Sequence, residues 1–240
     1  MTYCVGLLLN AGMVLLSDTR TNAGLDNIST YRKMFTFGTP DERVITILTA
    51  GSLSVTQTAL ARLEEAIADP EASGARSILE AQSMLDVADI VGSTLNSVAR
   101  EVAGRMQMKN LASASMILAG QRRDGRMRLF LIYPEGNFIE ATDETPFLQI
   151  GEHKYGKPIL DRVITPETSL TDAKKAVLLS MDSTLRSNLS VGMPLDLAVI
   201  EKDACRVTEQ MRIEPGDPTF AAMSEAWSTA LREGFANVTL

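Results

Sequence analysis

The chain has 240 residues, of which 45% are hydrophobic and 22% are charged, and its formal net charge at pH 7 is -7. This length and composition are typical of a globular protein with a sizeable core, and we expect a single domain over residues 1–240. The acidic balance argues against a nucleic-acid partner, because such proteins cluster Lys and Arg to displace the counterions of phosphates.

The cysteine positions and the lengths of the hydrophobic runs indicate the cellular compartment. Cys4 and Cys205 are far apart and outside any paired metal-ligand spacing, so we expect neither a disulfide nor a metal site, in a reducing, cytoplasmic compartment. No run of about 18 apolar residues is present, so we expect no membrane partner. Residues 3–16 are apolar enough for a signal peptide, but no basic segment precedes them and Asn10-Ala11-Gly12 interrupts them. We therefore interpret them as part of the mature fold.

The first fifty residues predict strands. Residues 2–9 and 13–19 are apolar, β-compatible runs joined by Asn10-Ala11-Gly12, which predicts a hairpin that begins at the chain terminus. Further strands are predicted around 30–37 and at 44–49, separated by Gly38-Thr39-Pro40.

Two helices are predicted next. Apolar residues recur at helical spacing from about residue 54, and Asp69-Pro70 is expected to end that helix. Ser77 and Glu80 form a capping-box pattern ahead of a long apolar stripe, which predicts a second helix from residue 77 to residue 102. The stripe consists of Met84, Ala88, Val91, Leu95, Val98 and Val102.

In the second half of the chain strands are predicted first, and helices and strands then alternate. Runs at 111–120, 127–133 and 137–143, broken by Asp124-Gly125 and Pro134-Glu135-Gly136, predict a meander. We then expect helices at 155–164 and 171–189, strands at 195–202 and 206–213, and a closing helix at 221–235. This order predicts an α+β fold with two sheets face to face and helices outside.

Most common catalytic patterns are absent from the sequence. His153 is the only histidine and lies in a polar loop, and neither G-x-S-x-G, H-E-x-x-H nor a Walker A pattern occurs. The remaining candidate is Thr2, which removal of Met1 would place at the N-terminus. Because a free α-amine titrates near about 7.7–8, Thr2 could supply both nucleophile and base.

The predicted hairpin gives Thr2 two candidate partners. A three-residue loop places Thr2 opposite Arg20 and makes Asp18 its diagonal neighbour on the same face, about 7–8 Å away at Cα. A two-residue loop points Asp18 to the other face. Lys33 on the next strand is the natural cation for Asp18, and its charge would favour the deprotonated amine and hydroxyl. The alternative is that Asp18 and Lys33 are solvated charges at a turn and a strand edge.

Several segments together resemble a known family. Thr2, VLLSDTRTNAG at 14–24, Lys33 and the TAGS turn at 49–52 resemble proteasome β subunits and HslV, members of the Ntn-hydrolase superfamily. TYCVG at 2–6, SDTRTNAGLDNISTYRKM at 17–34 and IGEHKYGKPIL at 150–160 are most similar to the bacterial proteasome-like group called Anbu. The resemblance implies a four-layer αββα sandwich, no metal or organic cofactor, and a homo-oligomer built as a ring or an open spiral. It assigns no ATPase partner.

The resemblance also implies roles for particular residues. Thr2 corresponds to the catalytic threonine, Asp18 to the acid that pairs with the active-site lysine, and Lys33 to that lysine. The backbone N–H of Gly51, in the TAGS turn, corresponds to the oxyanion donor.

Two positions depart from the pattern of active relatives. Those relatives have a serine where this chain has Glu152, and an aspartate in an R-D-x-x-S-G pattern where this chain has Ser187. Ser190, the serine of that pattern, is retained. We expect Ser187 and Ser190 to support the site, with Ser187 offering a hydroxyl in place of a charge.

The favoured function is a threonine-type peptidase or amidohydrolase that attacks a peptide or amide carbonyl through an acyl-enzyme. The alternative is a catalytically weak or inactive subunit that serves in assembly or peptide binding, which the changes at Glu152 and Ser187 favour. A third reading, with Cys4 as the nucleophile, needs the loss of three residues.

Overall fold

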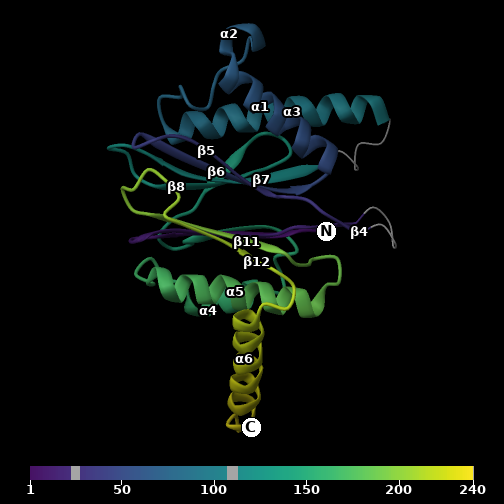
Figure 1. Cartoon of the computed structure of the whole chain (residues 1–240), viewed down its shortest axis with the longest axis vertical. Coiled ribbons are helices and arrows are strands. Elements are labelled where there is room, and N and C mark those ends of the chain that lie inside the picture. Colours follow the sequence, from purple (N-terminus) through teal and green to yellow (C-terminus); the bar gives the residue numbers. More distant parts are fainter. Residues whose placement is uncertain (23–27, 107–112, 240) are drawn as a thin grey trace.

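The computed structural model describes residues 1–22, 28–106 and 113–239. Its elements stack in four layers, with two sheets face to face and helices on both outer sides (Figure 1), which confirms the predicted αββα sandwich. Within this described part, the helices are too short or too polar to cross a membrane.

One sheet contains the N-terminal strand at an inner position and places residues from both ends of the chain side by side. In spatial order it consists of β10 (Phe147–Gly151), β1 (Tyr3–Leu9), β2 (Gly12–Asp18), β11 (Leu195–Glu201) and β12 (Glu209–Ile213). All neighbouring strands are antiparallel. Beyond the end of β2, a short ribbon pairs β3 (Arg20–Asn22) with β4 (Ile28–Thr30).

The second sheet follows chain order and is also antiparallel. It consists of β5 (Met34–Thr39), β6 (Arg43–Gly51), β7 (Ala114–Arg122), β8 (Arg128–Ile132) and β9 (Phe138–Glu140). The last three strands are the predicted meander. Residues 111–112, predicted as the start of its first strand, lie outside the described residues.

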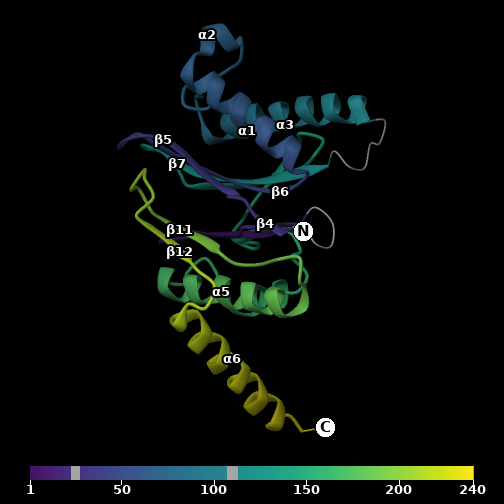
Figure 2. The ribbon, with the colours of Figure 1, turned by 45° about the vertical axis from the view of Figure 1, so that its right-hand side comes forward.

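Helices cover both outer faces. The second sheet is covered by α1 (Leu53–Ala68) and α3 (Met84–Met106), with the short α2 (Pro70–Ser73) after α1. The first sheet is covered by α4 (Lys157–Val163) and α5 (Leu170–Ser187). The last helix, α6 (Pro218–Ala236), extends away from α5 and from the sandwich (Figures 1 and 2).

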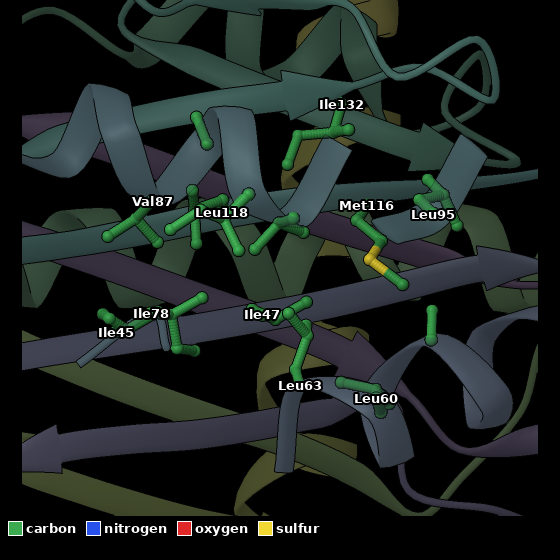
Figure 3. Packing of buried hydrophobic residues seen from close by; sticks show 14 of the residues in the cluster. Ile45, Ile47, Leu60, Leu63, Ile78, Val87, Leu95, Met116, Leu118 and Ile132 are labelled. Atoms are coloured by element: carbon green, nitrogen blue, oxygen red, sulfur yellow. The ribbon is translucent and has the colours of Figure 1, made fainter. Parts of the chain in front are cut away.

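Three apolar clusters fill the spaces between the layers. In β6, Ile45 and Ile47 face the helices, while Val44 and Leu48 face the other sheet. Because both faces of such strands are buried, they read as continuous apolar runs rather than as alternating ones. Figure 3 shows the cluster between the second sheet and its helices, in which Ile47 and other strand residues pack with Leu63 and further residues of the helices.

The turn between β1 and β2 has two residues. Cys4 pairs with Ser17 and Leu9 pairs with Gly12, so the turn is Asn10-Ala11. The three-residue loop that would set Asp18 on the face of Thr2 is therefore wrong. This register places Asp18 opposite Tyr3.

The second long helix begins later than its capping pattern predicts, at Met84 rather than Ser77. Arg43 explains the delay, because its guanidinium donates hydrogen bonds to the carbonyl oxygens of Ile78 (2.7 Å) and Ala81 (2.6 Å). These hydrogen bonds hold residues 78–81 in a turn and an irregular stretch outside the helix. The Ser83 hydroxyl instead accepts a hydrogen bond from the Asp86 N–H at 3.1 Å and caps the helix.

Two strand predictions also needed correction. The single strand predicted around 30–37 is two elements, β4 and β5, with residues 31–33 between them in an irregular stretch. Strand β10 was not predicted, although it pairs directly with β1. Its segment is short and ends in a polar loop, so periodicity gave little signal.

Candidate active site

Thr2 directly precedes β1 and is held from the side by β10. Its side chain and backbone are 8% exposed, whereas Met1 is 60% exposed. The Thr2 carbonyl accepts a hydrogen bond from the N–H of Glu152 at 2.7 Å. Gly151 has a φ of +79°, and a Cβ there would lie 1.9 Å from the Thr2 carbonyl oxygen. Only glycine permits this close approach, so the GE pair at 151–152 fixes the backbone of the candidate nucleophile.

A buried ion pair lies beside the N-terminal strand. The Lys33 ammonium donates to Asp18 Oδ1 at 2.7 Å and to the Arg20 carbonyl at 2.6 Å. Asp18 is 0% exposed and Lys33 is 4% exposed. The predicted pairing of these two residues is thus present, and neither is the solvated charge of the alternative interpretation.

Two backbone groups complete the environment of the Asp18 carboxylate. The Tyr3 N–H donates to Oδ1 at 3.1 Å, and the Gly192 N–H donates to Oδ2 at 3.2 Å. Burial raises the pKa of the Asp18 carboxyl, while the Lys33 ammonium and the two N–H donors act against that rise. Each polar contact therefore compensates part of the cost of burying the charge.

Asp18 reaches Lys33 despite the two-residue turn because it is the last residue of β2. After it, Thr19 leaves the sheet, its hydroxyl donating to the Pro194 carbonyl at 2.6 Å. The carboxylate can then accept the N–H of Tyr3 at the end of the strand pair. At a strand end the alternation of faces no longer fixes the direction of a side chain, which can fold along the edge.

The TAGS turn is tied to the same region. The Thr49 N–H donates to the Lys33 carbonyl at 2.9 Å, and the Cys4 thiol donates to the Thr49 carbonyl at 3.7 Å. Gly51, two residues further on, ends β6 with a φ of +104°, and a Cβ there would lie 2.5 Å from the Ser113 carbonyl oxygen. Glycine is therefore required at this turn by geometry, whatever role its N–H has.

The two predicted supporting serines occupy different surroundings. Ser187 is the exposed last residue of α5, and its hydroxyl makes no hydrogen bond within the described part of the chain. Ser190 is half-buried, and its N–H donates to Asn188 Oδ1 at 3.0 Å. The loop of Ser190 meets the ion pair through Gly192, the donor to Asp18.

Sequence reasoning assigned no structural role in this region to three residues, Arg20, Gly192 and Tyr3. Arg20 donates from Nη1 to the Leu189 carbonyl at 2.9 Å, and a Cβ at Gly192 would lie 2.1 Å from Arg20 Nε. Arg20 therefore packs on the loop that carries Gly192. The only signal was the glycine itself, which closes the run Ser190-Val191-Gly192 just before a strand.

Tyr3 is the third missed residue. Its phenol is fully buried, forms a 2.6 Å hydrogen bond with the Ser180 hydroxyl, and accepts one from Gln149 Nε2 at 2.5 Å. Burial raises the pKa of Tyr3 to about 12, against the opposing effect of the two hydrogen bonds. The side chain of Tyr3 is thus anchored to α5 and β10, while its N–H holds Asp18.

His153 is exposed, and its Nδ1 lies 3.1 Å from the Gly151 carbonyl oxygen. Among residues 1–22, 28–106 and 113–239, no group of three or more His, Cys, Asp or Glu side chains is arranged to hold a metal ion.

Comparisons with known proteins agree on one family. The family model described as "Proteasome subunit" matches residues 2–200. No curated protein sequence matches the chain.

Solved structures match over nearly the whole length. Anbu, the ancestral β-subunit from Yersinia bercovieri, is 42% identical with a TM-score of 0.92, over 99% of this chain and 98% of that one. Anbu from Hyphomicrobium sp. strain MC1 is 46% identical with a TM-score of 0.89, over 99% and 98%. The helical assembly of the Anbu complex from Pseudomonas aeruginosa is 43% identical with a TM-score of 0.93, over 99% and 97%. The chain therefore belongs to the proteasome subunit family, in its Anbu group.

Proposed function

We propose that this chain is an N-terminal-nucleophile hydrolase in which Thr2, freed by removal of Met1, cleaves a peptide or amide bond. One observation carries the proposal: the Lys33 ammonium and the N–H of Tyr3, the residue next to Thr2, bind the same oxygen of the buried Asp18 carboxylate. A cation held this close to the chain terminus favours the neutral α-amine over its protonated form.

The proposed reaction has two steps. Thr2 Oγ attacks the substrate carbonyl carbon, its proton passes to the α-amine, and the amine then protonates the leaving nitrogen as the C–N bond breaks. The N–H of Gly51 stabilises the oxyanion of the tetrahedral intermediate. Water, deprotonated by the same amine, then hydrolyses the ester and releases the acid. Asp18 positions Lys33, and both act through the charge beside Thr2.

The test begins with the intact mass of the purified protein, which should lack Met1. A peptide epoxyketone, which needs both an amine and a hydroxyl, should then add to Thr2. Thr2→Ala should lower labelling and turnover by at least about a thousandfold, because the nucleophile is gone. Thr2→Ser, the matched control, should keep measurable labelling. Turnover by Thr2→Ala, or Met1 retained in the native host, contradicts the proposal.

The pH dependence of labelling gives a second readout. The labelling rate should rise with pH through the pKa of the α-amine, which is about 7.7–8 for an ordinary terminus, because only the neutral amine accepts the proton. A rate that is flat across this range would show that the amine is not the base.

Cys4 is a poor alternative nucleophile. Its thiol is fully buried and donates to a backbone carbonyl, and burial raises its pKa, so the reactive thiolate is disfavoured. A Cys4→Ala variant should therefore retain epoxyketone labelling.

We further propose that copies of the chain self-assemble, as a ring or an open spiral, through α6. This helix has no buried residue, and Leu231 and Phe235 are 53% and 82% exposed on it. It is attached near its start, where the Ser224 hydroxyl donates to Asp182 Oδ1 at 2.7 Å. A related structure is described as a helical assembly of the Anbu complex. An exposed apolar helix of this kind is stabilised by burial against a partner.

Sedimentation of the full chain tests this second proposal. Leu231→Glu with Phe235→Glu should dissociate the oligomer, whereas Glu233→Gln on the same helix should leave it intact. If the double variant sediments like the unmodified protein, α6 is not the assembly surface. An assembled but unreactive protein would favour the alternative of an inactive assembly subunit. The Ser187 hydroxyl supports that alternative, because it makes no hydrogen bond within the described part of the chain.

A further inference from the structure

The tip of the β7–β8 hairpin concentrates positive charge in an otherwise acidic chain. Residues 122–128 read RRDGRMR, so four of the seven are arginines, although the whole chain carries a net charge of -7. We refer to residues 122–128 as the arginine hairpin. Its arginines are Arg122, Arg123, Arg126 and Arg128, and all four line one cavity of about 440 Å³ together with Gln82 and Ser83.

The charges of the arginine hairpin are only partly neutralised by the chain itself. Glu140 serves two of the arginines, Arg128 in a bidentate pair at 2.7 and 2.5 Å and Arg126 at 3.6 Å. Among the described residues, Arg122 and Arg123 form no ion pair with an acidic side chain within 4.0 Å. The Arg122 guanidinium donates to the Gln82 carbonyl at 2.8 Å. Exposed guanidinium groups therefore retain donors for carboxylates.

The hairpin tip is held in one shape. Gln121 is 1% exposed, and its Nε2 donates to the Gly125 carbonyl at 2.8 Å and to Asp203 Oδ1 at 2.7 Å. The Gly125 N–H closes the turn on the Arg122 carbonyl at 2.9 Å. A fixed turn presents its arginines with little ordering cost on binding.

The cavities around the hairpin tip differ in charge and in apolar content. Two more cavities, of about 540 and 490 Å³, border the same tip, and Gly125 lines all three. The larger of these adds apolar surface from Leu8, Leu9 and Met127. Carboxylates line both of the added cavities, so the excess of positive charge is confined to the first cavity; they belong to Asp41, Asp124, Glu140, Asp143 and Asp203. A polypeptide segment matches this division when its carboxylates lie over the first cavity and its apolar side chains lie beside Leu8, Leu9 and Met127.

The arginine hairpin is remote from Thr2. Strand β7 begins at Ala114, paired with Gly51, and ends at Arg122, so the two sites lie at opposite ends of the sheet. Eight residues of strand separate these ends by roughly 27 Å. We infer that the arginine hairpin docks an acidic segment of a partner protein, at a surface separate from the candidate active site.

Fluorescence anisotropy with a labelled octaglutamate peptide tests the inference on the full chain. The peptide should bind at low salt and be released as salt rises. Because the chain as a whole repels an anionic peptide, binding reports a local positive surface. Arg123→Gln with Arg126→Gln should weaken binding by about tenfold, since two exposed charge contacts are lost. Neither change removes a strong internal contact: within the described part of the chain Arg123 has no acidic partner within 4.0 Å, and Arg126 is 75% exposed.

The matched control is Arg100→Gln with Arg105→Gln, two exposed arginines in the second half of α3. It changes the net charge equally and should leave the affinity within about twofold. Equal weakening by both double variants, or no binding by the unmodified protein, would overturn the inference. Binding of tripolyphosphate that Arg123→Gln with Arg126→Gln abolishes, without binding of octaglutamate, would assign the cavity to small anions and would also overturn the inference. Thr2→Ala should bind octaglutamate unchanged, so this test is independent of the proposed catalysis.

Discussion

The two ends of the sandwich hold ion pairs of the same length in opposite environments. At the N-terminal end, Lys33 and Asp18 are 2.7 Å apart and almost fully buried. At the arginine hairpin, Arg128 Nε and Glu140 Oε1 are also 2.7 Å apart, but both side chains reach solvent. The distance alone therefore does not show which of the two ion pairs is more costly to break. Burial decides the cost of losing a partner, because only a desolvated charge has no water to replace it.

The largest expected effect comes from breaking the buried pair. Lys33→Met leaves the Asp18 carboxylate buried without its cation and should lower the free energy of unfolding by about 3–5 kcal/mol. Urea denaturation at neutral pH measures the loss. Without Lys33, the raised pKa of Asp18 rises further, so protonation stabilises the folded variant. The defect should therefore shrink as the pH falls and Asp18 becomes neutral.

The control for this prediction removes both charges. Asp18→Asn with Lys33→Met should recover much of the lost stability, since no uncompensated charge remains. If the double variant is as unstable as the sum of the two single ones, the residues contribute independently and the ion pair is not the source of the effect. Neither Lys33→Met nor the double variant should react with the epoxyketone at the rate of the unmodified protein.

The same comparison explains what the sequence could predict. Burial on both faces gives the strands their continuous apolar runs, so most of them were located from hydrophobicity alone. The pair Asp18 and Lys33 was expected from a hairpin with a three-residue loop and from the resemblance to proteasome β subunits. The turn length was misjudged, because Asn10-Ala11-Gly12 is compatible with both two- and three-residue turns and only packing selects one. Backbone donors such as the Gly192 N–H carry no side-chain signal at all.

Other errors come from side chains that act far from their place in the sequence. The helix start at 77 failed because of Arg43, which lies 35 residues from Ile78, whose carbonyl it takes. Tyr3 looked like any strand residue, since its partners Ser180 and Gln149 become neighbours only in the folded chain. The sequence indicated only a turn at Asp124-Gly125 in the arginine hairpin, because the cavity that its arginines line forms only in the folded chain.

An intermediate effect is expected for Tyr3→Phe, which removes a neutral buried group at the N-terminal end. Ser180 and Gln149 lose a partner, so the free energy of unfolding should fall by about 1–3 kcal/mol. The folded-state pKa of Tyr3, about 12, lies above its ordinary value of 10.0. The contribution of the phenol is therefore complete below pH 10 and is lost as the pH rises toward 12. The difference between the two proteins should narrow over that range.

Tyr31→Phe is the matched control for Tyr3→Phe. Tyr31 is 41% exposed, so its variant should change stability by less than about 0.5 kcal/mol. Epoxyketone labelling adds a readout at the site, because a loosened Tyr3 anchor should slow the reaction of Thr2. Equal effects of the two variants would show that the buried hydrogen bonds of Tyr3 contribute nothing specific.

The smallest effect on stability is expected at the exposed end, for Glu140→Gln. The Arg128 guanidinium holds the pKa of Glu140 below its ordinary value of 4.5, so the pair stabilises the fold above that pH and is lost as the pH falls through the lower folded-state pKa. Solvent screens the pair, and the loss at neutral pH should be about 1 kcal/mol or less. The same change frees Arg126 and Arg128, so octaglutamate should bind more tightly than to the unmodified protein. Unchanged or weaker binding would mean that Glu140 does not compete with an acidic ligand for these arginines.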